Sequence, residues 1–124
     1  MSLEGLITVA KGEAQPDLTL KNARVVNTFT AEIEQTNVAI YEGRIAGIGD
    51  YDDGREVIDL TGKYLAPGLI DGHIHIESSM LAIGEYARAV IPRGVSGVVT
   101  DLHEIANVSG LSGMTYMLEG ANGL

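Results

Sequence analysis

Two histidines placed one residue apart are the feature of this sequence that could most directly do chemistry. His73 and His75 lie in the stretch PGLIDGHIHIESSM. On a β-strand, alternate residues point to the same face and the rise is about 3.3 Å per residue, so the two imidazoles project side by side. Imidazole nitrogens bind Zn²⁺ at about 2.0–2.1 Å. The spacing therefore favours one metal ion held by both rings. The alternative is a pair of histidines satisfied by backbone and carboxylate partners.

Two carboxylates flank this pair. Asp71 and Glu77 share the face of the histidines if the strand continues regularly. For Asp71 we favour a structural role, holding the strand end or an imidazole N–H. Glu77 has two interpretations. It contacts a substrate or orients a metal ligand at the rim of the site, or it is stabilised by N–H groups at the start of a helix.

A third histidine follows a second apolar run, in the stretch VVTDLHEIAN. The spacing of Asp101 and Glu104 resembles a capping box, with Asp in place of Ser or Thr, so both are predicted to cap a helix. His103 is a candidate for catalysis, substrate contact or metal binding. Asn107 is a weaker candidate.

From residue 68 onward, the pattern alternates between strands and helices. Apolar runs at 68–76 and 95–101 indicate strands, and the spacing within 78–94 and 103–124 indicates helices. Strand–helix–strand–helix is the order of a parallel sheet covered by helices, so this part is predicted to be α/β. In an α/β barrel, chemistry is sited at the C-terminal ends of the strands. The histidines follow such ends.

The two expected helices have recognisable limits. Ser78 or Ser79 is the predicted N-cap of the first, which Pro92 and Gly94 end. The second carries an apolar stripe, and Gly110 and Gly113 weaken the helical pattern in its first half. The stripe consists of Ile105, Val108, Leu111, Met114, Met117 and Leu118.

The first 67 residues have a different texture. Residues 1–16 carry little pattern and are predicted to be a flexible or peripheral lead-in. Alternation in 17–28 predicts a half-buried strand, and 38–48 predicts a hairpin around Glu42-Gly43. Another short strand pair follows, so we expect a small antiparallel sheet or sandwich that ends near Pro67.

Composition narrows the class of protein. The formal net charge of −9 disfavours binding to nucleic acid. The N-terminal stretch lacks the pattern of a secretory signal, and no run approaches the roughly 20 apolar residues of a membrane span. The absence of cysteine excludes disulfides and thiolate ligands, so any metal is held by histidine and carboxylate. We expect a cytoplasmic protein without a membrane or nucleic-acid partner.

The motif LAPGLIDGHIHI resembles the first barrel strand of the amidohydrolase superfamily, metal-dependent hydrolases of C–N bonds. The continuation through HIESSM, EYARAVIPRG and VVTDLHEIANVSG is similar to the adenine deaminase family. That resemblance covers nearly all of the chain from about Asp17. One departure is Leu102, where the family usually has proline. The resemblance implies domains at 1–67, the N-terminal part of a small β-sandwich, and at 68–124, the first two βα units of a TIM-like (β/α)8 barrel.

Carried over, the resemblance makes His73 and His75 ligands of a divalent manganese, iron or zinc ion, with a binuclear site in the full-length protein. A metal-activated hydroxide would attack C6 of adenine and yield hypoxanthine and ammonia. A complete barrel takes about 250 residues, whereas Gly68 to Leu124 accommodates about two strand–helix units. We therefore expect this chain to be incomplete and inactive alone, and to pair with itself or with the missing remainder of the barrel.

Two other functions are compatible with the residues. One is another cyclic amidohydrolase, similar to dihydroorotase or hydantoinase, which would share the His-x-His strand. The other is a non-catalytic truncated module that acts in oligomerisation.

Overall fold

The computed structural model describes residues 2–124, which divide into two compact units, one ending at Pro67 and the other running from Gly68 to Leu124. Helices and strands both occur, so the mixed α/β class expected from the sequence is confirmed. Among the described residues, no helix is both long and apolar enough to cross a membrane.

The first unit begins with helix α1 (Leu3–Ala10), where the sequence predicted a flexible or peripheral lead-in. The flexible alternative is wrong, because an N-cap and a hydrogen bond from a residue distant in the sequence fix the segment. The Ser2 hydroxyl accepts the Gly5 N–H at 3.3 Å as an N-cap. At the other end, the Tyr51 hydroxyl donates to the Ala10 carbonyl at 2.7 Å. Val9 is buried, so the helix packs by one apolar residue that 3.6-residue periodicity alone does not reveal.

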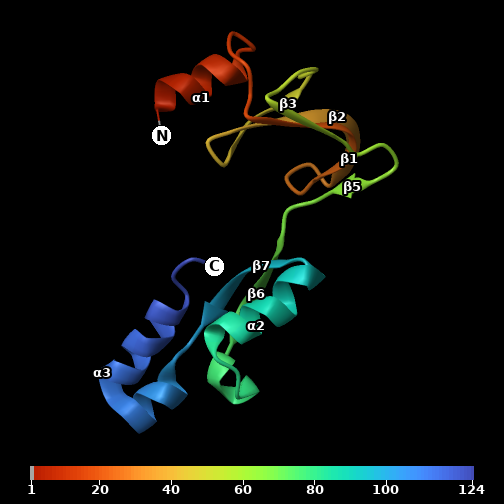
Figure 1. The fold of residues 1–124 in the computed structure, drawn as a ribbon. Coiled ribbons are helices and arrows are strands. Elements are labelled where there is room, and N and C mark those ends of the chain that lie inside the picture. The colour runs from red at the N-terminus through yellow and green to blue at the C-terminus, as the bar shows by residue number, and fades with distance from the viewer. Residues whose placement is uncertain (1) are drawn as a thin grey trace. The chain divides into compact units, whose positions relative to one another are not determined.

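The rest of this unit is a five-stranded sheet (Figure 1). Its strands are β1 (Leu18–Asn27), β2 (Glu32–Tyr41), β3 (Arg44–Gly49), β4 (Glu56–Asp59) and β5 (Tyr64–Leu65). The order is β3-β2-β1-β4, and β5 also pairs with β1. β1–β2 and β2–β3 are antiparallel, but β4 and β5 run parallel to β1. The sheet is therefore mixed, which corrects the antiparallel sheet expected from the sequence. After β3, the chain crosses to the far side of β1 instead of turning back on itself.

The predicted hairpin between β2 and β3 is confirmed. Its two turn residues, Glu42 and Gly43, have φ values of 46° and 73°. Positive φ at both central positions is the signature of the type I′ turn, whose twist matches that of the flanking strands.

A small core holds the sheet together. Ala23, Val25 and Val38 form its buried cluster. Thr19 is fully buried, and its hydroxyl donates to the Asp53 carbonyl at 2.5 Å, which satisfies a polar group that would otherwise be costly to bury.

The second unit has the expected order of strand, helix, strand and helix. Its elements are β6 (Leu69–Ile74), η1 (Ile76–Ser79), α2 (Ile83–Val90), η2 (Ile91–Arg93), β7 (Val95–Thr100) and α3 (His103–Gly120). β6 and β7 pair in parallel, as predicted. The two C-terminal ends therefore lie at the same edge of this small sheet.

The limits of α2 differ from the prediction. Neither Ser78 nor Ser79 is its N-cap, which is Ala82 without a side-chain hydrogen bond. The Ser79 hydroxyl instead donates to the Ile76 carbonyl at 2.6 Å and accepts the Leu81 N–H at 3.3 Å. These bonds stabilise the short 3₁₀ turn η1, so the α-helix begins only after it.

α3 is kinked, and its predicted apolar stripe is only partly buried. Gly110 has φ 59° and ψ −149°, which lies outside the helical region. Val108 and Leu111 beside it are 83% and 79% exposed, whereas Met117 is buried. The stripe is therefore not a buried face in the described chain around the kink.

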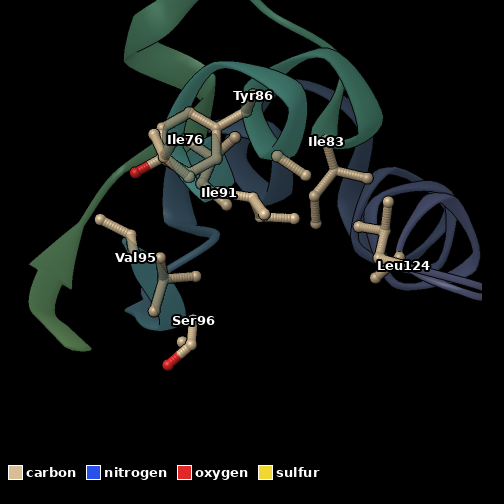
Figure 2. Close-up of a pocket in the computed structure, with 12 residues that line it drawn as sticks. Ile76, Ile83, Tyr86, Ile91, Val95, Ser96 and Leu124 are labelled. Carbon is tan, nitrogen blue, oxygen red and sulfur yellow. The ribbon is translucent and has the colours of Figure 1, made fainter. Parts of the chain in front are cut away.

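An apolar cavity of about 270 Å³ lies between α2, β7 and the C-terminal end of the chain. Figure 2 shows Ile83, Tyr86 and Ile91 on one side of it and Val95 and Ser96 on the other. Its lining is mainly aliphatic, and the histidines are not part of it. The cavity is thus a packing feature of the second unit, separate from its polar end.

Candidate metal centre

The parallel pairing of β6 and β7 brings all three histidines of the sequence to one edge of the sheet. Ile74 at the end of β6 pairs with Thr100 at the end of β7. His75 directly follows the first strand, and Asp101 directly follows the second. Residues that lie 26 positions apart in the sequence therefore become neighbours.

His73 and His75 lie side by side, as their spacing predicted. Their Nε2 atoms are 3.2 Å apart, and their ring planes are nearly perpendicular at 88°. This separation suits two nitrogens that each lie about 2.0–2.1 Å from a common ion.

The other nitrogen of His75 has a partner of its own. Its Nδ1 lies 3.0 Å from the backbone carbonyl oxygen of Asp101. A carbonyl oxygen only accepts hydrogen bonds, so Nδ1 carries the hydrogen. In the neutral ring, Nε2 then presents a lone pair toward His73. Histidines that bind metals are commonly oriented in this way by a backbone carbonyl or a carboxylate.

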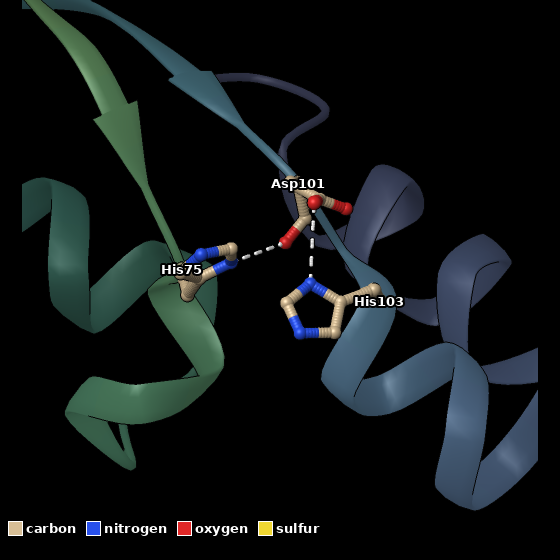
Figure 3. Close-up of side chains that lie close together, drawn as sticks. All are labelled: His75, Asp101 and His103. Carbon is tan, nitrogen blue, oxygen red and sulfur yellow. Dashed lines mark hydrogen bonds and ion pairs between the residues drawn. The ribbon is translucent and has the colours of Figure 1, made fainter.

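Asp101 also contacts the third histidine, through its side chain. Its Oδ2 atom lies 3.2 Å from His103 Nδ1, and the rings of His75 and His103 are 4.7 Å apart and nearly perpendicular. Figure 3 shows Asp101 between the two histidines, with its main chain toward His75 and its carboxylate toward His103. One donor atom from each of these three residues lies within 4.8 Å of the others.

The predicted capping box is not formed. The N-cap of α3 is Leu102, and it has no side-chain hydrogen bond. Asp101 turns its carboxylate to His103, and Glu104 accepts a hydrogen bond from the Ser78 hydroxyl at 2.7 Å. The partner of Asp101 is a neighbour in the sequence, whereas that of Glu104 is brought close by the pairing of β6 with β7. Both side chains compete with the backbone N–H groups.

Glu77 lies outside the strand, because β6 ends at Ile74 and Glu77 belongs to η1. The expectation of one regular strand from Asp71 to Glu77 is therefore wrong. Glu77 Oε1 accepts the N–H of Ile105 at 3.3 Å, in the first turn of α3. Its Oε2 is buried and has no hydrogen-bond partner among the described residues. The helix whose N–H it accepts is therefore α3 and not α2, which follows Glu77 directly in the sequence.

Asp71 remains within β6, where its Oδ1 accepts the backbone N–H of His73 at 3.1 Å. This contact fits the structural role that we favoured for it, at the strand rather than at an imidazole. Asn107 is exposed on α3.

A comparison with known protein families finds a match in the part of the chain that carries the histidines. Residues 64–124 match the model of the Amidohydrolase family. This segment is similar to members of that family. It includes β6, β7 and every histidine of the cluster.

This chain has relatives that carry a more specific name. It is 60% identical over 120 residues to an adenine deaminase of Dehalococcoides mccartyi (strain ATCC BAA-2100 / JCM 16839 / KCTC 5957 / BAV1), and 97% of this chain is aligned. It is 54% identical over all of its 124 residues to an adenine deaminase of Kosmotoga olearia. The chain spans about a fifth of the length of these curated relatives, 21% and 22% respectively.

Two solved structures resemble it in fold. An N-acyl-D-glutamate deacylase from Bordetella bronchiseptica, complexed with zinc and a phosphonate inhibitor, matches 70% of this chain and 19% of its own, with a TM-score of 0.59 and 26% identity. A D-aminoacylase, studied for its binuclear metal centre, matches 68% of this chain and 18% of its own, with a TM-score of 0.58 and 32% identity.

Two contacts in residues 68–124 could not be found from the sequence. They are the bond from His75 to the Asp101 carbonyl and the bond from Ser78 to Glu104. Both depend on the register between β6 and β7, and no local pattern encodes that register.

Proposed function

We propose that this chain is part of an adenine deaminase, a metal-dependent hydrolase that converts adenine and water to hypoxanthine and ammonia. The names of the relatives support this substrate. Since the chain spans about a fifth of their length, the activity belongs to a longer protein, and we expect the chain alone to be inactive. The observation that carries the proposal is the pair of Nε2 atoms, 3.2 Å apart, on His73 and His75.

The donor set fits the metal that this function requires. Both nitrogens face each other, and the bond from His75 Nδ1 to the Asp101 carbonyl leaves the Nε2 lone pair of His75 available. Imidazole is a common ligand of zinc, iron and manganese enzymes, so His73 and His75 would hold one of these ions. When bound, such an ion supplies a nucleophile at neutral pH by lowering the pKa of water. A second ion would be held largely by residues beyond this chain.

The remaining polar residues have supporting roles in this proposal. Asp101 orients His75 through its carbonyl. Glu77 and His103 are the candidates for contact with adenine, and Glu77 has a buried carboxylate oxygen without a partner in the described chain. Asp71 holds the backbone of His73 within its strand.

The proposal also assigns each of the two units to a domain of the longer enzyme. Residues 68–124 would be the first two βα units of a TIM-like barrel, with the histidines at the C-terminal ends of its strands. Residues 1–67 would be the N-terminal part of a small β-sandwich. Exposed apolar residues in α3, such as Val108 and Leu111, would be covered by the remainder of the barrel or by another copy of the chain. We also expect the enzyme to be cytoplasmic and to have no nucleic-acid or membrane partner.

A chimera tests this function. These 124 residues would replace the matching 124 residues of the Kosmotoga olearia relative, and adenine turnover would be followed by hypoxanthine formation. We expect activity in the chimera and its loss in His73→Ala and His75→Ala. Arg88→Ala, on the exposed side of α2, is the control and should retain activity.

The outcome separates the competing functions. Hydrolysis of dihydroorotate or a hydantoin in place of adenine would favour another cyclic amidohydrolase. Full adenine turnover in both histidine variants would contradict the metal assignment.

A further inference from the structure

We propose that Ser78 is a positioning residue, which acts through Glu104 to fix the place of His103. The Ser78 hydroxyl donates to Glu104 Oε1 at 2.7 Å, although 26 positions separate the two residues in the sequence. The inference rests on the proposed function, in which His103 is a candidate for contact with adenine. It gives a role to a serine that is not the N-cap of α2.

The start of α3 has no side-chain cap of its own. Its N-cap, Leu102, makes no side-chain hydrogen bond, although the first N–H groups of a helix have no partner within the helix. Both buried residues of α3, Gly113 and Met117, follow the kink at Gly110. The first turn, which carries His103, therefore takes its capping partners from outside the helix.

Two consecutive residues of η1 supply these partners. Glu77 Oε1 accepts the Ile105 N–H at 3.3 Å. The Ser78 hydroxyl donates to Glu104, which directly follows His103. Carboxylates near the first turn of a helix are also favoured by the helix dipole. The two bonds thus attach neighbouring residues of η1 to neighbouring residues of α3.

The turn η1 has anchors of its own. Ile76 is fully buried and lines the cavity beside α2 and β7. The Ser79 hydroxyl donates to the Ile76 carbonyl at 2.6 Å. His75 is the N-cap residue of η1, so the turn begins where β6 has just ended. A bond from η1 to the start of α3 therefore ties His103 to the end of β6, and the ring centre of His103 lies 4.7 Å from that of His75.

Kinetics of the chimera described above test the inference. Ser78→Ala removes the donor, and Glu104→Met removes the acceptor but keeps an unbranched side chain that favours a helix. We expect each to raise KM for adenine about threefold or more, which is the size of one lost hydrogen bond. A loss of folded enzyme would instead lower the maximal rate per total protein at unchanged KM. Ser78→Thr keeps a hydroxyl and should restore the wild-type KM.

A double-mutant cycle shows whether Ser78 acts through Glu104. If it does, Ser78→Ala should have no further effect on KM in the Glu104→Met background, whereas additive effects would overturn the inference. Ser112→Ala is the matched control. The Ser112 hydroxyl also makes an exposed hydrogen bond in α3, to the Ser109 carbonyl at 2.6 Å, but it lies after the kink. This variant should keep the wild-type KM.

Hydrogen exchange of the same chimera gives a readout that does not depend on the reaction. Amides at the start of α3 should exchange faster in Ser78→Ala than in the wild type or Ser78→Thr, and those of α2 should not change. In an active chimera, a raised KM without faster exchange, faster exchange with an unchanged KM, or neither effect would overturn the inference.

Failure of the proposed function has a different signature. A chimera with the wild-type residues that does not deaminate adenine would contradict the proposed function and leave the contact between Ser78 and Glu104 in place. Exchange at the start of α3 still decides whether Ser78 holds this turn: faster exchange in Ser78→Ala supports it, and unchanged exchange overturns it.

Discussion

His75 and Asp101 are joined by a hydrogen bond that only the pairing of β6 with β7 can create. His75 Nδ1 lies 3.0 Å from the Asp101 carbonyl oxygen, although 26 residues separate the two in the chain. The orientation of a candidate metal ligand therefore depends on the register of two strands. Substitutions that disturb this pairing are expected to disturb the histidines as well.

Gly68→Ala should disturb it. A Cβ atom at Gly68 would lie 2.5 Å from the Cβ of Ser96 on β7, which is far below an ordinary contact. We expect a loss of about 1–3 kcal/mol in the free energy of unfolding, as for other overpacked sites. Chemical denaturation followed by circular dichroism measures this loss.

Two further variants make this prediction specific to the contact. Gly72→Ala places a Cβ where no atom lies within 4 Å, so it should be tolerated. Adding Ser96→Gly to Gly68→Ala removes the atoms that collide and should restore part of the stability. Equal losses in Gly68→Ala and Gly72→Ala would contradict the explanation.

Local patterns in the sequence were sufficient to predict many of the helices and strands. Alternation and the Glu42-Gly43 turn predicted β1 and the hairpin, and the apolar runs predicted β6 and β7. The parallel pairing of β4 with β1 was not predicted, because nothing local shows to which side of β1 the chain returns. Helix α1 was missed because its partner, Tyr51, lies about 40 residues away, and the missed caps depended on competing side-chain contacts.

The geometry of the candidate site was likewise predictable from the sequence only in part. The i, i+2 spacing of His73 and His75 was sufficient to place their rings side by side, since both lie on extended backbone. The roles predicted for Asp101 and Glu104 failed because each carboxylate found a side chain in place of a backbone N–H. His103 could be named as a candidate, but its contact with His75 requires the fold.

Gly110→Ala should destabilise the second unit. Gly110 has φ 59° and ψ −149°, a conformation that is essentially restricted to glycine. We expect a loss of about 1–3 kcal/mol, or a straightened helix that moves Val108 and Leu111. Hydrogen exchange of the α3 amides measures the effect.

Gly84→Ala is the matched control, because Gly84 lies in α2 and an added Cβ would have no atom within 4 Å. Alanine is the better helix former, by roughly 0.5–1 kcal/mol, so this variant should be as stable as the wild type or more stable. A stabilising effect of Gly110→Ala without a change in α3 would be inconsistent with the kink.

Asp59 should make the stability of the first unit depend on pH. A hydrogen bond from Asn22 Nδ2 at 3.0 Å and further bonds from Thr61 lower the pKa of Asp59 below its usual value. The folded pKa lies below the unfolded one, so the stabilisation is present above the unfolded pKa of about 3.9 and is lost as the pH falls through the folded pKa. Melting temperatures of the wild type and Asp59→Asn should converge in that acidic range.

Asn22→Gly tests the cause of this pKa shift. Glycine tolerates the φ of 59° at this position but provides no side-chain donor. The variant should show a smaller loss of stability toward acidic pH than the wild type. A difference in melting temperature between wild type and Asp59→Asn that stays constant from neutral to acidic pH would contradict the assignment.

Glu77→Gln should separate the two interpretations of Glu77. Glutamine can still accept the Ile105 N–H through its carbonyl oxygen, so the contact at the start of α3 survives and the melting temperature should change little. The buried Oε2 atom has no partner among the described residues, and such an atom in a native fold calls for an explanation.

If Oε2 faces the substrate, replacing the carboxylate by an amide removes a charged acceptor for the N–H groups of adenine. We therefore expect at least about a tenfold loss of adenine turnover in the chimera, the size of a positioned polar or acid–base contribution. Glu85→Gln removes an exposed carboxylate on α2 and should leave turnover unchanged. Wild-type turnover in Glu77→Gln would show that Glu77 serves only to hold η1 against α3.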